Sequence, residues 1–201
     1  QNELGQMSYL FQQLAVIYNS MDKPTKALEV IGEGKEILGK DEGLVRQELG
    51  IYQSRPELFE NAREKFESAI AESPDDINLK LSYAGLLEQN KMADEAFKYY
   101  QEAYESDPKS LQANYGMGAY YINKAATLSE QKMEMKKDAE IEKANEEIIA
   151  LLEKAYPYMK WLHEEQPDNR EWLSQLVTIA PIIGKDEEMA EYAKKLRTLN
   201  E

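Results

Sequence analysis

The chain has 201 residues and no cysteine, and 38 acidic against 24 basic residues give it a net charge of −14. The negative charge disfavours nucleic acid as a partner, because it repels a phosphate backbone, and the absence of cysteine excludes disulfides, thiolate metal sites and a cysteine nucleophile. No apolar run approaches the roughly 20 residues of a membrane-spanning helix, so no membrane insertion is expected. The content of 42% apolar and 31% charged residues, with few Val and Thr, favours an all-α fold.

An internal period of 34 residues separates Pro74 from Pro108. The same shift pairs residues of one size class: Ala62 with Ala96, Phe66 with Tyr100, Ala69 with Ala103, and Gly50 with Ala84. Such a period predicts stacked pairs of antiparallel helices, none of which can bury its apolar face alone. We expect the small residues where two helices approach most closely, and the aromatic residues between hairpins. The prolines and their polar neighbours end one hairpin before the next begins.

Two segments resemble the tetratricopeptide repeat family. The stretch LQANYGMGAYYINK is similar to its first helix, with Tyr115, Gly118 and Tyr121 on signature positions, and MADEAFKYYQEAYESDP is similar to its second. The tryptophan usual early in the first helix is replaced by Arg46 and Lys80 in the second and third repeats. The resemblance implies one right-handed α-solenoid over residues 1–201. Its five helix-turn-helix repeats are expected at about 8–42, 43–76, 77–110, 111–169 and 170–201.

The fourth repeat is 25 residues longer than the others, because Pro167 follows Pro108 by 59 residues instead of 34. The extra residues fall at about 125–149, where apolar residues keep helical spacing. We therefore expect both helices of this repeat to be elongated, with a turn near 129–135, a second helix over 137–165 and a kink at Pro157. The long hairpin is either a decoration without a role, or it covers the end of the groove or docks a partner.

Candidate chemistry is sparse. His163 is the single histidine, with neither cysteine nor a second histidine to complete a metal site, and we interpret it as a packing or surface residue. The GEGK stretch at 32–35 lacks the spacing of a phosphate-binding loop. We predict no cofactor, no metal and no enzymatic activity.

The resemblance implies that the first helix of each repeat lines a concave groove. The residues at its inward positions are Tyr9, Gln12, Val16, Asn19, Leu44, Gln47, Ile51, Arg55, Asn78, Leu81, Gly85, Glu88, Gln112, Tyr115, Ala119 and Asn123. Family members that grip a carboxylate terminus use Lys, Asn and Arg there, and that clamp is missing. An extended or helical segment held by amide hydrogen bonds and apolar contacts fits better, although each of these residues could instead pack against a neighbouring repeat.

The predicted function is a protein-interaction scaffold that binds a peptide or protein segment in this groove. The alternative is a structural or assembly module that self-associates through its ends or its long hairpin, which allows a homo-oligomer. The long insertion is similar to that of repeat proteins from bacterial cell envelopes. It favours the periplasm or the membrane surface over the cytoplasm.

Overall fold

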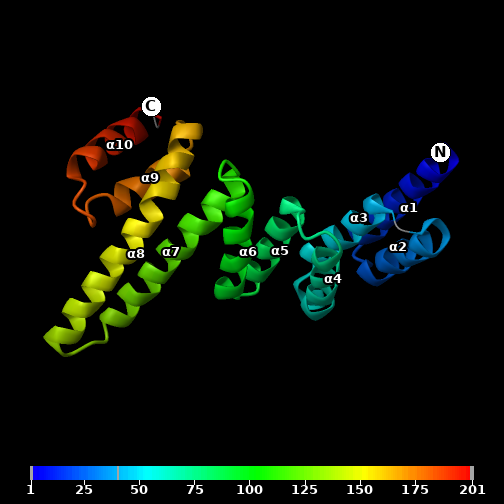
Figure 1. Cartoon of the computed structure of the whole chain (residues 1–201), viewed down its shortest axis with the longest axis horizontal. Helices are drawn as coiled ribbons and strands as arrows, with labels where there is room; N and C mark the ends of the chain where they lie inside the picture. The colour runs from blue at the N-terminus through cyan, green and yellow to red at the C-terminus, as the bar shows by residue number, and fades with distance from the viewer. Residues whose placement is uncertain (1, 40, 200–201) are drawn as a thin grey trace. The chain divides into compact units, whose positions relative to one another are not determined.

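The computed structural model describes residues 2–39 and 41–199, which form ten α-helices and one short 3-10 helix without any strand (Figure 1). The prediction of an all-α helical-repeat fold is confirmed. The chain divides into two compact units, unit 1 (Gln1–Met92) and unit 2 (Ala93–Glu201). The third predicted repeat contributes one helix to each unit, and a single continuous solenoid stays a prediction.

Each unit is a series of helices in chain order. Unit 1 contains α1 (Asn2–Ser20), α2 (Pro24–Leu38), α3 (Glu42–Gln53), η1 (Pro56–Leu58), α4 (Phe59–Glu72) and α5 (Ile77–Gln89). Unit 2 contains α6 (Ala93–Ser106), α7 (Leu111–Lys132), α8 (Asp138–Glu165), α9 (Arg170–Ile179) and α10 (Asp186–Thr198).

Side chains cap the starts of α3, α5, α7 and α9. The Asp41 carboxylate accepts from Leu44 N at the start of α3, and the residues in the same role at α5, α7 and α9 are Asp76, Ser110 and Asn169. Such a cap satisfies an amide donor that the first turn leaves without an intrahelical partner. Because Asp76 and Ser110 lie 34 residues apart, the cap recurs with the sequence period.

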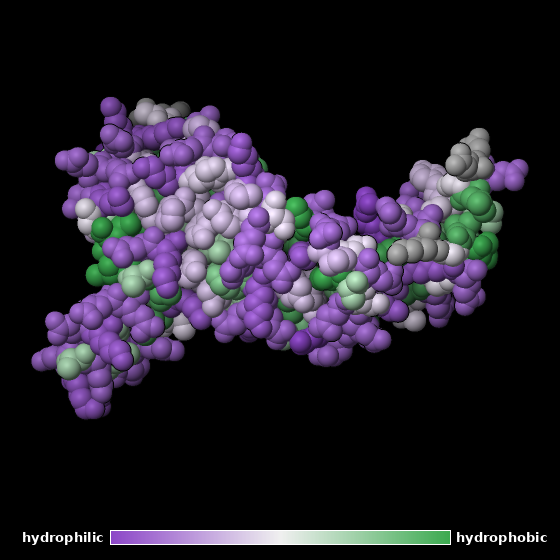
Figure 2. Space-filling view, in the orientation of Figure 1, coloured by the Kyte–Doolittle hydropathy of each residue, from purple (hydrophilic) through white to green (hydrophobic). Residues whose placement is uncertain are grey.

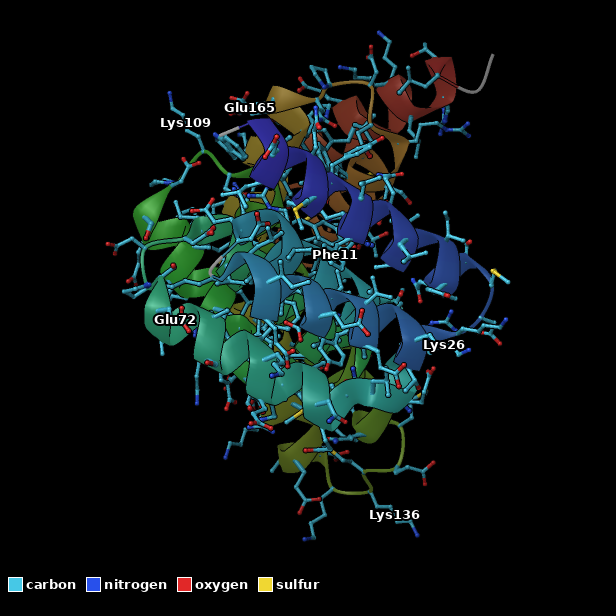
Figure 3. All side chains as sticks on the ribbon, turned by 90° about the vertical axis from the view of Figure 1, so that its right-hand side faces the viewer. Phe11, Lys26, Glu72, Lys109, Lys136 and Glu165 are labelled. Atoms are coloured by element: carbon cyan, nitrogen blue, oxygen red, sulfur yellow. The ribbon has the colours of Figure 1, made fainter. Side chains whose placement is uncertain are left out.

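The core of unit 1 begins where α1 packs on α2 and α3. The buried side chains of this cluster are Ala15, Ala27, Val30, Ile31, Leu44 and Ile51. Phe11, labelled on α1 in Figure 3, lies so close to Gly34 of α2 that a β-carbon there would be 2.9 Å from its ring. Further along unit 1, Phe66 stacks on Tyr83 with ring centroids 5.2 Å apart.

Gly50 corrects one expectation from the period. Its partner position Ala84 is fully buried, and so is Ala62 of the other small pair, as expected of small residues between helices. Gly50, however, is exposed, and a β-carbon on it would meet nothing within 4 Å. Its small size opens a surface instead of allowing a close helix contact.

Unit 2 is built around the long hairpin of α7 and α8, with 22 and 28 residues. The second helix begins one residue after the predicted position and ends at the predicted Glu165. The tip lies at 133–137, slightly later than predicted, and carries Lys136 (Figure 3). The helix continues through Pro157. The core of the unit continues onto α9 and α10 through Leu152, Met159, Leu162, Trp172, Leu173, Leu176, Ile179 and Tyr192.

Candidate functional site: a groove in unit 1

A groove of about 630 Å³ opens in unit 1 between α3, α4 and α5. The lining residues are Glu42, Val45, Arg46, Leu49, Gly50 and Gln53 of α3, Phe66, Ala69 and Glu72 of α4, Ser73 and Asp76 of the connection, and Asn78, Leu79 and Ser82 of α5. Figure 3 labels Glu72, which closes α4 at this edge. The site therefore has helical walls on three sides.

The groove exists because α3 and α5 are joined by few direct contacts. The Gln53 side-chain amide reaches across and donates to the backbone carbonyl of Ser82 at 2.9 Å. Gly50 contributes no side chain to the space between the helices. A larger residue at position 50 would fill this space, while the ring of Phe66 lies fully buried beneath the lining.

The lining combines apolar surface with an excess of acid. Val45, Leu49 and Leu79 supply aliphatic walls, while three carboxylates, those of Glu42, Glu72 and Asp76, face a single guanidinium from Arg46. Opposite charge at a rim steers a ligand and fixes its orientation. The groove therefore combines aliphatic side chains with an excess of negative charge.

The residues predicted to line a concave groove are distributed over both units. Tyr9, Val16, Asn78, Gln112, Tyr115 and Asn123 are exposed; Gln12, Asn19, Gln47, Arg55, Gly85, Glu88 and Ala119 are partly buried; Leu44, Ile51 and Leu81 are buried in the core. Only Asn78 among them lines the 630 Å³ groove. The buried members pack between helices, so their side chains are not available to a ligand.

Arg55 was predicted on an inward face of a helix, but α3 ends two residues before it. A residue that precedes proline is biased away from helical geometry, and position 56 is a proline. The Arg55 guanidinium instead donates to the side-chain oxygen of Asn19 at 3.1 Å and to its backbone carbonyl at 2.8 Å. It also pairs with Asp22, so it joins the end of α1 to the α3–α4 connection.

Unit 2 holds a polar cluster around Glu188 of α10. Its carboxylate accepts from the Tyr156 hydroxyl at 2.6 Å and pairs with Lys160 and Lys185 at 3.0 and 3.1 Å. These contacts, the Tyr156 hydrogen bond first, lower the pKa of Glu188 to about 2. Burial, followed by the hydrogen bond to Glu188, raises the pKa of Tyr156. Every group in the cluster has a partner, which indicates a structural link between α8 and α10.

His163 lies next to this cluster, with its ring edge-on to Tyr192 at 5.5 Å. Burial, followed by the nearby charge of Lys195, lowers the pKa of the imidazole. Its Nδ1 is buried without a hydrogen-bond partner. Among residues 2–39 and 41–199 there is no group of three or more His, Asp or Glu placed to hold a metal ion.

None of the helices in the described part of the chain combines the length and the apolar character needed to cross a membrane. The longest of them, α8, is rich in charged residues.

The capped first helices, the 34-residue period and the helical hairpins define a helical-repeat protein with the tetratricopeptide fold. No protein-family model matches the sequence, and no curated protein matches it. Several solved structures, however, are similar to the fold of this chain. The structure titled "MamA RS-1 ArsTM double mutant" matches with a TM-score of 0.69 at 16% identity, over 98% of this chain and 96% of that one.

Two further structures support the same fold. MamA 41-end from Desulfovibrio magneticus RS-1 matches with a TM-score of 0.67 at 15% identity, covering 98% and 97% of the two chains. YrrB, described as a TPR protein with an unusual peptide-binding site, matches with a TM-score of 0.62 at 15% identity, covering 94% and 84%. The resemblance to tetratricopeptide repeat proteins is therefore confirmed at the level of the fold.

Proposed function

We propose that this protein is an interaction scaffold that holds a peptide segment of another protein in the groove of unit 1. The observation that carries the proposal is the 630 Å³ opening between α3, α4 and α5, with the partly exposed side chains of Val45 and Leu79 in its lining. That volume lies within the roughly 300–1,000 Å³ of ligand pockets. It accommodates one or two large side chains, not a folded domain.

The chemistry of the lining defines the class of segment. Val45 and Leu79, which are partly exposed, favour an aliphatic or aromatic side chain that leaves water on entering the groove. Glu42 and Asp76 at the ends of this surface favour Lys or Arg beside that side chain. Asn78 and Ser82 can hydrogen-bond the peptide backbone. The ligand is thus an apolar residue flanked by basic residues.

Two further considerations support a binding role. YrrB, a protein of the same fold, is described by its title as having a peptide-binding site. The groups of a catalytic centre, namely a nucleophile beside a base, are not brought together in the groove lining. The inward positions predicted from the sequence, such as Gln47 in unit 1 and Tyr115 in unit 2, remain proposed secondary contacts, each considered within its own unit.

The test is selection from a random peptide library displayed on phage, followed by anisotropy measurements with the enriched peptides. We expect enrichment of apolar residues next to Lys or Arg. The variant Gly50→Leu fills the groove without a clash, because a β-carbon there meets nothing within 4 Å. It should weaken binding by more than about tenfold.

The matched control is Gly32→Leu, which also adds a leucine to an open, exposed glycine position, but on α2 and outside the groove. It should bind the peptides like the wild type. Equal affinity of the Gly50→Leu and Gly32→Leu variants would place binding elsewhere and refute the groove, and so would enrichment of acidic peptides.

A further inference from the structure

Helix α1 is apolar on two faces, and only one of them is covered. The first face, with Phe11, Ala15 and Tyr18, packs against α2 and α3. The second face carries a row of large apolar side chains that face solvent: Met7, Leu10, Leu14, Ile17 and Met21, with exposed fractions of 37%, 64%, 40%, 52% and 53%. We call this row the α1 seam. In Figure 2 hydrophobic surface is visible at the N-terminal end of the chain, where α1 begins.

The spacing of the α1 seam is that of a helix–helix contact. Its members follow one another at intervals of three, four, three and four residues, which is the a/d pattern of a coiled coil. Met21 follows the last helical residue, but its amide still donates to the Ile17 carbonyl at 3.0 Å, so the helical path continues. The row therefore forms one straight stripe along the helix.

The composition of α1 points the same way. Charged residues make up 31% of the chain, yet within Asn2–Ser20 only Glu3 is charged. A solvent-facing helix normally carries charge on its outer face. Leu4, Tyr9 and Val16 are also exposed on α1 but lie outside the row. Exposed large apolar residues on other helices and loops, such as Ile37, Met133 and Ile182, are scattered, and scattered residues need no covering partner.

We propose that the α1 seam is the interface of a closed dimer, in which α1 of one copy packs antiparallel on α1 of a second copy. A single apolar row can contact the same row of another copy around a two-fold axis, because such an interface is self-complementary. A chain with a net charge of −14 repels its own copies. The nearly uncharged α1 is the place where two copies meet with the least repulsion.

The orientation follows from charge. An antiparallel pair aligns the helix dipoles favourably. It also brings the end that carries Glu3 beside the opposite end of the partner helix, which is followed by Lys23 and Lys26. A parallel pair would place the two Glu3 carboxylates at the same end. The Leu14 side chain, in the middle of the row, then lies nearest the two-fold axis.

The area is sufficient for a specific contact. The exposed fractions of the five seam residues correspond to on the order of 500 Å² per copy, so that pairing buries about 1,000 Å², the lower limit for a biological interface. A head-to-tail chain of copies would need a second apolar face, and the exposed residues of α10 are charged or small. The interface therefore closes after two copies.

The test compares two double variants by sedimentation equilibrium across a dilution series. Leu10→Lys with Ile17→Lys places two charges in the α1 seam. The control, Tyr9→Lys with Val16→Lys, changes exposed apolar residues of the same helix that lie outside the seam. Both pairs lower the net negative charge equally, so general repulsion cannot account for a difference between them.

We expect a wild-type dimer that dissociates on dilution, a seam variant whose dissociation constant rises by more than about tenfold, and a control variant that dimerises like the wild type. A wild-type chain that stays monomeric at every concentration overturns the proposal. Equal dissociation of both variants, or of neither, also overturns it.

A second measurement keeps the test independent of the folding of the charged variants. Because the chain contains no cysteine, Leu14→Cys introduces a single thiol, and mild oxidation should link two copies near the axis. Disulfides require Cα atoms within about 7 Å. The Tyr9→Cys variant, on another face of α1, should stay uncrosslinked, and equal crosslinking of both would contradict the arrangement. Binding of a foreign helix instead of a second copy would appear as a monomer without crosslinks.

Discussion

The ring of Tyr100 on α6 lies directly over Gly116 on α7, where a β-carbon would come within 3.0 Å of three of its carbon atoms. Tyr100 is only 5% exposed, so its ring has little space to move aside. Gly116→Ala should therefore destabilise the protein by about 1–2 kcal/mol through overpacking, despite the better helix propensity of alanine. Chemical denaturation measures the difference.

The control for this substitution is Gly50→Ala. Position 50 is also inside a helix, but a β-carbon there would meet nothing within 4 Å. Only the better helix propensity of alanine then acts, and it should stabilise the folded protein by about 0.5–1 kcal/mol. Opposite signs for the two variants are expected. Destabilisation by both would mean that Gly50 is needed for its backbone conformation, in contradiction of the open surface described above.

Arg55 holds the end of α1 to the α3–α4 connection through three acceptors on Asn19 and Asp22. Arg55→Ala should cost about 1–3 kcal/mol in the free energy of unfolding, because the hydrogen bonds of a charged donor are lost. Arg55→Lys should recover only part of it, since lysine lacks the planar fork that reaches the acceptors together. Thermal melting of both variants checks this, and full recovery by lysine would reduce the role of Arg55 to its charge.

Glu188 gives the protein a stability that depends on pH. Its folded-state pKa of about 2 lies below the ordinary value of 4.5, so the unfolded state binds a proton first as the pH falls. The contribution is complete above about pH 5 and is lost between there and pH 2. It amounts to roughly 1 kcal/mol, because about a third of the side chain is exposed to screening solvent.

The comparison for this prediction is Glu188→Gln, which keeps the shape of the side chain but does not titrate. Urea denaturation at several pH values should give a stability difference from the wild type that narrows as the pH falls from 5 to 2. A difference that stays constant over that range would show that the cluster around Glu188 acts through packing and not through charge.

Ser110 caps α7 by accepting a hydrogen bond from the amide of Ala113 at 3.2 Å. Ser110→Ala should reduce the free energy of unfolding by about 1 kcal/mol. Ser106 provides a matched control, since its hydroxyl only donates back to the carbonyl of Glu102 within α6. Ser106→Ala should change stability by less than about 0.5 kcal/mol, and equal effects would argue against a capping role for Ser110.

The repeat pattern predicted much of the fold because it reports local rules. The 34-residue period placed the ends of α4 and α6 just before Pro74 and Pro108, and the apolar spacing placed α8 within one residue of its start. Proline, capping residues and helical spacing all act over a few positions, so the helix ends and helix types that they determine can be predicted without tertiary structure. The buried state of Ala62, Ala96 and Phe66 followed from the same pattern.

The site was harder to predict, because it depends on spaces between helices. Ile51 and Leu81 occupy positions that line a groove in the family, but here they pack in the core. Gly50 looked like a close-contact residue, yet no neighbouring side chain approaches it. Whether a small residue brings two helices together or leaves a gap is decided by the opposite helix, which the spacing of one repeat does not reveal.

Two features of the sequence could have predicted further details of the structure. The proline at position 56 predicts that α3 ends early, which takes Arg55 out of the helix. The near absence of charge in Asn2–Ser20 predicts a helix with more than one covered face. Neither the proline nor the low charge of this segment recurs with the 34-residue period, so an alignment of the repeats does not detect them.

The long hairpin of α7 and α8 also has a kinetic consequence. Its two helices are joined by only a few residues at 133–137 and contact each other along their length, so the hairpin can form at a low cost in loop entropy. In a repeat protein, folding can begin at any repeat and propagate to its neighbours. We expect folding to begin at this hairpin, with α9 and α10 adding to an existing surface.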